Sequence, residues 1–294
     1  MIDELKNENI KFKEISEKEA LNYLKQNNNY YNICLYKNLF EKYYINGEYI
    51  NKYIDLDFAY LKDLAIIDFE LRLLLYNMIS DVEHYLKFRL VKILNENRNV
   101  IEKYLDKNNR NKYVGNKKIN DKLSVNDFLN FLSFGKIVEF YEFTIKQYKI
   151  REDKKYIFLL KEIVVLRNNV YHNRKILINL NEYSDNYIIN PTILDYLKKC
   201  NIDKNMKNII SNSSIRQFTC LLYIFNSFVT SKEIKNHVNE LLNDFMFDRV
   251  NRNKNYYKNN KLLKMIYKFF KKIIIKEFSN SHWLTLQYVL ILIC

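Results

Sequence analysis

The chain has 294 residues, of which 48% are hydrophobic and 28% are charged, so it has enough apolar surface for a large core and is not intrinsically disordered. Only three glycines and one proline occur, whereas sheet-rich folds need many tight turns. We therefore predict an all-α fold. The formal net charge of +14 favours a polyanionic partner, either nucleic acid or an anionic membrane. AT-rich coding sequence produces an excess of Lys, Asn, Ile and Tyr, and the lysines among them account for part of that charge.

Cysteine spacing and the chain ends bear on compartment and cofactors. The four cysteines stand far apart, at Cys34, Cys200, Cys220 and Cys294. Without a C-x2-C pair they exclude a zinc finger and give no reason to expect disulfides, so we expect a cytoplasmic protein without metal or cofactor. The N-terminus lacks the apolar core of a signal peptide. The apolar run 283–294 is too short to span a bilayer; we interpret it as a docked helix or dimer contact, with a membrane-surface anchor as the alternative.

Helix signals begin near the N-terminus. Ser16-Glu17-Lys18-Glu19 is a capping box that opens a short helix towards Gln26. A second helix is predicted over about 32–44, ending near Gly47. From Asp57 onwards, apolar residues at helical spacing predict one very long helix, or two with a break around Ser80-Asp81. The apolar positions on this helix are Leu61, Leu64, Ala65, Leu75, Met78, Ile79, Val82, Leu86, Leu90 and Ile93.

The second half of the chain also has a helical pattern. The polar run 95–121 predicts a loop with at most a short helix, and Ser124 caps the helix that follows. Gly135 is predicted to separate that helix from another ending near Tyr148. Another helix is predicted at about 152–172. Asn190-Pro191 is then predicted to open a short helix, and the last two helices are predicted at about 215–228 and 231–247. We predict two domains, 1–248 and 249–294, the second beginning with a linker that runs to about residue 260.

The segment from Leu166 to Arg174 carries the candidate chemistry. An apolar stripe of Ile157, Leu160, Val164 and Tyr171 is predicted to include Arg167, and a buried guanidinium needs anionic or hydrogen-bonding partners. Asn168 and His172 lie four residues apart on a neighbouring face. Arg167 and His172 are about 140° apart on an ideal helix. The long arginine side chain, or a helix that ends near Asn173, must close that gap.

An arginine and a histidine together suit the cleavage of RNA without metal. The 2′-hydroxyl attacks the adjacent phosphorus, and histidine can accept or donate a proton near neutral pH. Arginine stabilises the charge that develops on the phosphoryl oxygens, and Asn168 can orient the imidazole or donate to the phosphate. One motif supplies a single histidine, so a homodimer would provide a separate acid and base. Arg-x4-His is a weak motif by itself, and the alternative is an arginine and histidine satisfied in a helix-end network.

Three ordered stretches resemble a known family. Leu166–Arg174 reads L-R-N-N-V-Y-H-N-R and resembles the L-R-N-x-x-x-H-N signature of AbiD/AbiF-like abortive-infection proteins, which belong to the HEPN superfamily of helical ribonucleases. The stretches Leu64–Arg72 and Asp81–Lys87 are similar to that family's first long helical region, and Leu132–Lys136 is similar to its S-F-G element. The resemblance covers about residues 20–240. It implies a HEPN-type helical bundle with a core at roughly 55–240 and additional N- and C-terminal helices.

The resemblance also implies an activity. It implies a metal-independent endoribonuclease toxin of phage defence, with Arg167 and His172 as the catalytic pair and Asn168 in support. Asn173, which ends the signature, and Arg174, which follows it, become candidates for RNA binding or support. Tyr171 departs from the family, which often has a small residue before the histidine. Some members are held in check by a small structured RNA, so RNA is expected both as substrate and as inhibitor.

Two i, i+4 pairs on the first long helix have two interpretations. Asp68 with Arg72, and Glu83 with Lys87, are placed to form intrahelical ion pairs. The functional alternative is that Asp68 or Glu83 holds Arg167, or that these residues, Lys87 included, line an RNA groove. Two alternatives to the nuclease also stay open. One is a HEPN protein that binds structured RNA without cutting it, and the other is an interaction protein whose basic face docks on a membrane or a protein.

Overall fold

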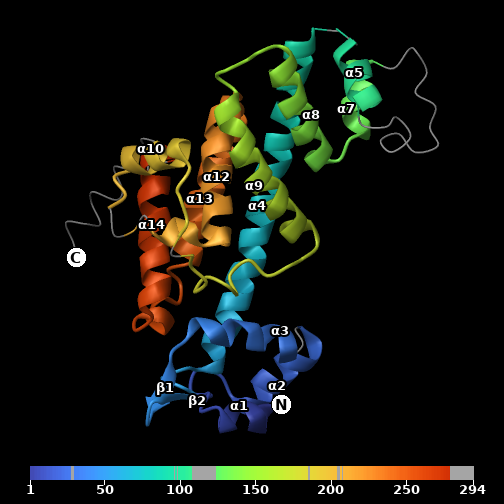
Figure 1. Cartoon of the computed structure of the whole chain (residues 1–294). Coiled ribbons are helices and arrows are strands. Elements are labelled where there is room, and N and C mark those ends of the chain that lie inside the picture. Colours follow the sequence, from blue (N-terminus) through green and yellow to red (C-terminus); the bar gives the residue numbers. More distant parts are fainter. Residues whose placement is uncertain are drawn as a thin grey trace. The chain divides into compact units, whose positions relative to one another are not determined.

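The computed structural model describes residues 1–27, 30–95, 97, 99–107, 124–184, 186–203, 206 and 208–278. Over these residues the fold is mainly α-helical, with twelve α-helices and one two-stranded hairpin, which confirms the predicted fold class (Figure 1). The chain divides into two compact units. Unit 1 holds the described parts of 1–74, 173–215 and 236–294, and unit 2 holds those of 75–172 and 216–235. The predicted domains 1–248 and 249–294 stay predictions; residues 236–278 group with the N-terminal region.

The long helix α4 and the helices α12 and α13 each contribute to both units. The elements of unit 1 are α1 (Ile2–Asn7), α2 (Glu17–Gln26), α3 (Tyr30–Cys34), the 3-10 helix η1 (Leu35–Leu39), β1 (Lys42–Ile45), β2 (Glu48–Tyr53), the start of α4 (Phe58–Leu94), α10 (Pro191–Lys199), η2 (Asn208–Ser211), the end of α13 (Lys232–Asn243), the π-helix η3 (Asp244–Arg249), η4 (Lys254–Tyr257) and α14 (Lys261–Glu277). Unit 2 adds α5 (Asn99–Lys107), α7 (Val125–Phe131), α8 (Phe134–Gln147), α9 (Lys154–Tyr171) and most of α12 (Ser213–Phe228).

Several predicted elements are confirmed. Capping boxes at Ser16 and Ser124 open α2 and α7. In each, the serine hydroxyl accepts from the backbone N–H of the third helical residue, whose carboxylate accepts in return from the serine backbone N–H. The helix α4 is continuous over 37 residues without a break at Ser80-Asp81. Its predicted apolar positions are buried except Ile93, which is half-buried beside the buried Leu94.

The predicted helix at 32–44 is confirmed only as far as Leu39 and is wrong beyond it. The helical region ends at Leu39, and the chain then forms the antiparallel hairpin of β1 and β2. Asn46 and Gly47 connect the strands with φ values of 52° and 91°, the left-handed pair that a two-residue hairpin turn requires. Tyr44 opposes Tyr49 across the strands, with ring centroids 4.9 Å apart. Flanking tyrosines and isoleucines therefore support a strand, because these residues favour extended backbone.

Gly135 does not separate α7 from α8 as predicted. The break lies at the extended residues Leu132 and Ser133, and Gly135 sits in the first turn of α8. A Cβ at Gly135 would lie 3.4 Å from Val164 Cγ1. That distance is an ordinary van der Waals contact, so the packing of α8 on α9 does not require a glycine at this position.

The segment predicted as a linker at 248–260 is structured. The α-helix α13 ends at Asn243 and continues as the π-helix η3, at whose end Arg249 is buried. The 3-10 helix η4 follows before α14 begins. The predicted tail at 283–294 lies outside the described residues. Across the described part of the chain, no helix combines the length and apolarity needed to cross a membrane.

Within unit 2, α9 is anchored at its N-terminus. Asp153, the residue before α9, is buried and accepts hydrogen bonds from Tyr141 Oη at 2.6 Å and Arg89 Nε at 3.0 Å. Further along, Glu162 pairs with Arg216 of α12 at 3.1 Å. The rings of Tyr156 and Phe228 meet edge to face at 5.0 Å. These contacts with α4, α8 and α12 fix the helix that carries the R-x4-H motif.

Candidate active site

The buried face of α9 differs from the predicted stripe. Leu159, Ile163, Leu166 and Val170 are buried together with Leu160, whereas Tyr171 is 38% exposed. Because α9 contacts α8 and also α12, its buried face is broader and rotated relative to the prediction. Arg167 consequently lies at the edge of that face and is half-buried.

Arg167 is held by an aromatic ring and an amide. Its guanidinium carbon lies 4.0 Å from the ring centroid of Tyr171, a cation–π distance. Its Nη1 donates to Asn168 Oδ1 at 3.4 Å, and its buried Nε has no hydrogen-bond partner in the part of the chain that the structure describes. Over the described ranges no carboxylate forms an ion pair with this guanidinium. The charge of Arg167 is therefore held in place without being neutralised.

Tyr171 is supported in turn by Tyr76 of α4. Their ring centroids lie 4.9 Å apart at 30°. Burial, followed by hydrogen bonding to Tyr76, raises the pKa of Tyr171, and the charge of Glu83 adds to this effect. The phenol therefore stays neutral at physiological pH and presents a ring face, not a charge, to Arg167. The sequence pattern did not single out Tyr76; the only signal was the unusual size of Tyr171 before the histidine.

His172 caps the C-terminus of α9. Its backbone N–H donates to Asn168 O at 3.1 Å, so the last turn of the helix stays closed. The side chain is exposed, and no hydrogen bond or ion pair engages the imidazole within the described residues. The helix α9 therefore ends at Tyr171, close to the end near Asn173 that the sequence pattern suggested. The imidazole of His172 is left open to a ligand.

The chain leaving α9 is fixed within unit 1. Asn173 adopts φ 53°, the left-handed conformation that ends many helices. Its Oδ1 accepts from Arg72 Nη1 at 3.2 Å. Asp68, fully buried, accepts from the backbone N–H groups of Ile176 at 2.7 Å and Leu177 at 2.8 Å. Asn173 and Asp68 thus shape the loop that follows the motif.

The two i, i+4 pairs both form in the structure. Asp68 Oδ2 and Arg72 Nε lie 3.1 Å apart in a buried pair. Burial raises the pKa of Asp68, while the Leu177 N–H, Arg72 and the Ile176 N–H act in the opposite direction. Glu83 Oε1 and Lys87 Nζ lie 3.2 Å apart in a half-buried pair. Both intrahelical pairs therefore form, Asp68 and Arg72 also bond to the chain after α9, and Glu83 acts electrostatically on Tyr171. That Asp68, Glu83 or Lys87 lines an RNA groove stays a prediction.

Other polar residues considered from the sequence lie at the surface. Arg174 is exposed, and so are His84 and His237. In the described part of the chain, no group of three or more His, Cys, Asp or Glu side chains is placed to hold a metal ion.

Comparison with known proteins places the chain in a family. The family model described as Abi-like protein matches residues 22–179, which is more than half of the 294 residues. The match runs from α2 through the loop after α9 and includes the whole R-x4-H segment. Neither a curated protein nor a solved structure matched the chain. The chain therefore belongs to the Abi-like proteins, an abortive-infection family.

Proposed function

We propose that this Abi-like protein is a metal-independent endoribonuclease of the HEPN type that acts as a toxin in phage defence. The family supports the defence role. One observation carries the nuclease role: the Arg167 cation in the last turn of α9 has no carboxylate partner among the described residues, and the exposed imidazole of His172 follows it at the helix end. The two residues are five positions apart, and Asn168 accepts from both: its Oδ1 from the Arg167 guanidinium and its backbone carbonyl from the His172 backbone N–H.

These groups match the demands of RNA transesterification. An imidazole removes the proton from the 2′-hydroxyl, which attacks the adjacent phosphorus while the 5′-oxygen leaves. The reaction produces a 2′,3′-cyclic phosphate and a 5′-hydroxyl. Arg167 donates hydrogen bonds to the phosphoryl oxygens as their negative charge increases. Tyr171 and Asn168 hold the guanidinium ready, which reduces the reorganisation that catalysis requires.

A second copy of the chain completes this chemistry. One motif provides one histidine, whereas the reaction uses a base for the nucleophile and an acid for the leaving group. We propose a homodimer in which each copy contributes a His172. The net charge of +14 favours RNA as substrate and a small structured RNA as inhibitor, because each phosphate neutralised adds affinity.

The test is the substitution His172→Ala, with His237→Ala as the matched control of another exposed histidine. Expression of the unmodified chain and of the control is expected to arrest bacterial growth and to fragment cellular RNA. The His172→Ala chain is expected to do neither while still binding RNA. Arrest and cleavage that persist in His172→Ala reject the nuclease. The second candidate, an RNA-binding protein that uses Arg167 for phosphate without cutting, then becomes the better account.

A further inference from the structure

Unit 1 contains a cavity of about 520 Å³, which is within the usual range of ligand pockets, about 300–1,000 Å³. Its walls come from four segments distant in sequence, 11–14, 38–41, 54–60 and 255–262, and from Asn181. All of these segments belong to unit 1, and none contains a residue of the R-x4-H motif. The cavity is therefore a candidate binding site in its own right.

Aromatic rings form one wall of this cavity. Tyr60 and Tyr256 stack with centroids 4.6 Å apart and planes 25° from parallel. Phe40 lies 6.5 Å from Tyr60 at a tilt. All three rings are half-buried, so part of each remains accessible. Such a surface is suited to a flat π-system, because bases stack on tyrosine and phenylalanine irrespective of their sequence.

Lysines at the cavity supply positive charge. Lys11 pairs with Asp55 at 3.3 Å, and Asp57 is occupied by the backbone N–H groups of Lys13 and Ala59. The side chains of Lys13, Lys258 and Lys261 are exposed at the lining. Among the residues that the structure describes, none of these three has an ion-pair partner. The four lysines of the lining equal its four carboxylates in number, so the cationic groups open to a phosphate are these three side chains and not a net positive charge.

The lining also offers groups that match the edges of a nucleobase. Asn255 and Asn259 present exposed amides, which are both donors and acceptors. Burial is the largest cause that raises the pKa of Tyr256, and the negative charge of Glu14 is the second. Glu14 therefore lies close to the stacked rings. A carboxylate can accept from an exocyclic amino group, and an amide can pair with an adenine edge.

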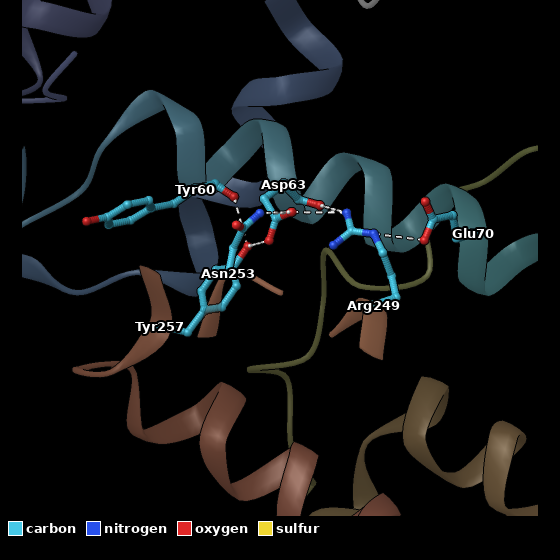
Figure 2. A network of polar contacts seen from close by, with 6 residues as sticks. All are labelled: Tyr60, Asp63, Glu70, Arg249, Asn253 and Tyr257. Carbon is cyan, nitrogen blue, oxygen red and sulfur yellow. Dashed lines mark hydrogen bonds and ion pairs between the residues drawn. The ribbon is translucent and has the colours of Figure 1, made fainter. Parts of the chain in front are cut away.

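A buried polar network holds the aromatic wall in place (Figure 2). The Tyr257 hydroxyl donates to Asp63 Oδ2 at 2.7 Å, and Asn253 Nδ2 donates to Asp63 Oδ1 at 3.0 Å. Arg249 Nη2 donates to the same Oδ1 at 3.0 Å. The figure shows the ring of Tyr60 pointing away from this cluster. The network therefore fixes the segment carrying Tyr256 against α4 and leaves the stacked rings to the cavity.

We propose that this pocket binds a nucleotide, with the base on the Tyr60–Tyr256 wall and the phosphate at Lys258, Lys261 and Lys13. The aromatic wall matches the face of the base, the amides match its edge, and the three exposed lysines match the phosphate. Its source is either a free nucleotide or one unit of an RNA chain. The site is distinct from the R-x4-H motif and does not depend on RNA cleavage.

The experiment is an equilibrium titration of the full chain by calorimetry with three probes. Adenosine 5′-monophosphate represents the free nucleotide, and a 2′-O-methyl hexa-adenylate, which lacks a nucleophilic 2′-hydroxyl, represents the RNA chain. Inorganic phosphate is the third probe and is expected to bind at least about tenfold more weakly because it cannot stack. Tyr256→Ala is expected to weaken nucleotide binding about tenfold or more, whereas Tyr256→Phe retains it. The double variant Lys258→Ala/Lys261→Ala is expected to weaken binding several-fold, and Lys254→Ala, an exposed lysine outside the lining, is expected to have no effect.

Each outcome decides the proposal. Binding of either nucleotide probe that requires Tyr256 supports it, and the tighter probe identifies the source. The proposal is overturned by absence of binding to both nucleotide probes at millimolar concentration, by phosphate binding as tightly as the nucleotides, or by equal affinity in Tyr256→Ala. Arg167→Ala separates this site from the proposed nuclease: it is expected to abolish cleavage and leave adenosine monophosphate binding unchanged.

Discussion

Arg167 depends on an aromatic neighbour for its position. The cation–π contact with Tyr171 at 4.0 Å is worth about 0.5–1 kcal/mol at an exposed site. Tyr171→Ala is therefore expected to lower kcat/KM for RNA cleavage about two- to fivefold, whereas Tyr171→Phe retains the ring and is expected to retain most activity. Single-turnover cleavage of a labelled RNA measures both variants. Equal losses in the two variants would show that the hydroxyl, not the ring, is what matters.

Asp68 makes a different kind of contribution, because it is fully buried. Its carboxylate accepts from two backbone N–H groups and from Arg72. Removing one partner of a buried pair costs about 3–5 kcal/mol, so Asp68→Ala is expected to lower the free energy of unfolding by about 3 kcal/mol. A urea titration measures the change. Glu83→Gln, in the half-buried pair, is the control and is expected to stay within about 0.5 kcal/mol of the unmodified chain.

At the residue scale, spacing predicted local partners but not distant ones. The i, i+4 rule predicted the Asp68–Arg72 and Glu83–Lys87 pairs, because helix geometry alone determines them. It could not predict that Asp68 also accepts from the N–H groups of residues 176 and 177, or that Tyr76 meets Tyr171. Those contacts join segments about a hundred residues apart in the sequence, and only the tertiary fold brings them together.

At the scale of elements, Glu142 connects α8 to α9. It accepts from Lys146 within α8 at 2.7 Å and pairs with Lys161 of α9 at 2.6 Å. Hydrogen bonds from both lysines lower the pKa of Glu142 below its usual value of 4.5. The carboxylate's stabilising contribution is therefore complete above that usual value and is lost as pH falls through the lowered pKa.

Glu142→Gln is consequently expected to lower Tm by about 1–2 °C near pH 7, which corresponds to about 0.5 kcal/mol. Near pH 3 the difference from the unmodified chain is expected to shrink, because the native carboxylate is then becoming protonated. Thermal scans at the two pH values measure this. Asp195→Asn, in an exposed pair within α10, is the control without an interhelical contact. A Tm difference that grows as pH falls contradicts the sign of this pKa shift.

Helix signals were informative wherever capping and periodicity agreed. The capping residues Ser16 and Ser124 and the long apolar repeat predicted α2, α7 and α4. The hairpin was missed because a tyrosine-rich stretch was treated as a continuing helix, although Asn46-Gly47 is a strong turn signal. The sequence predicts a helix break at Gly135, whereas the break lies at Leu132 and Ser133 and Gly135 is in the first turn of α8. A glycine in the sequence does not by itself distinguish a break from a position inside a helix.

At the scale of the whole molecule, the charge of +14 leads to a prediction on salt. If RNA is the partner, its affinity is expected to fall at least about tenfold between roughly 50 and 200 mM salt, since binding releases counterions from the phosphates. Filter binding of a 2′-O-methyl RNA measures it. At about 150 mM salt the chain is expected to bind more tightly than an unrelated protein of equal net charge. Equal affinity for the two proteins would favour the docking alternative.

The overall class was predictable and the grouping of segments was not. Few glycines and prolines were enough to predict a helical protein, because the breakers of long helices are rare. The assignment of residues 236–278 to the same unit as the N-terminal region could not be predicted. It depends on long-range contacts such as Arg249 with Asp63, which leave no periodic signal in the sequence.

The most direct test of the nuclease is the chemistry of the RNA ends that it produces. Purified protein is incubated with a labelled RNA in excess EDTA, and the ends of the products are identified by phosphatase and ligase sensitivity. The unmodified chain and the control Arg151→Ala, an exposed arginine before α9, are expected to leave 2′,3′-cyclic phosphates and 5′-hydroxyls. His172→Ala and Arg167→Ala are expected to leave the RNA intact with an unchanged Tm. Cleavage that stops in EDTA, or that continues in both variants, contradicts the assignment of Arg167 and His172 as the catalytic pair.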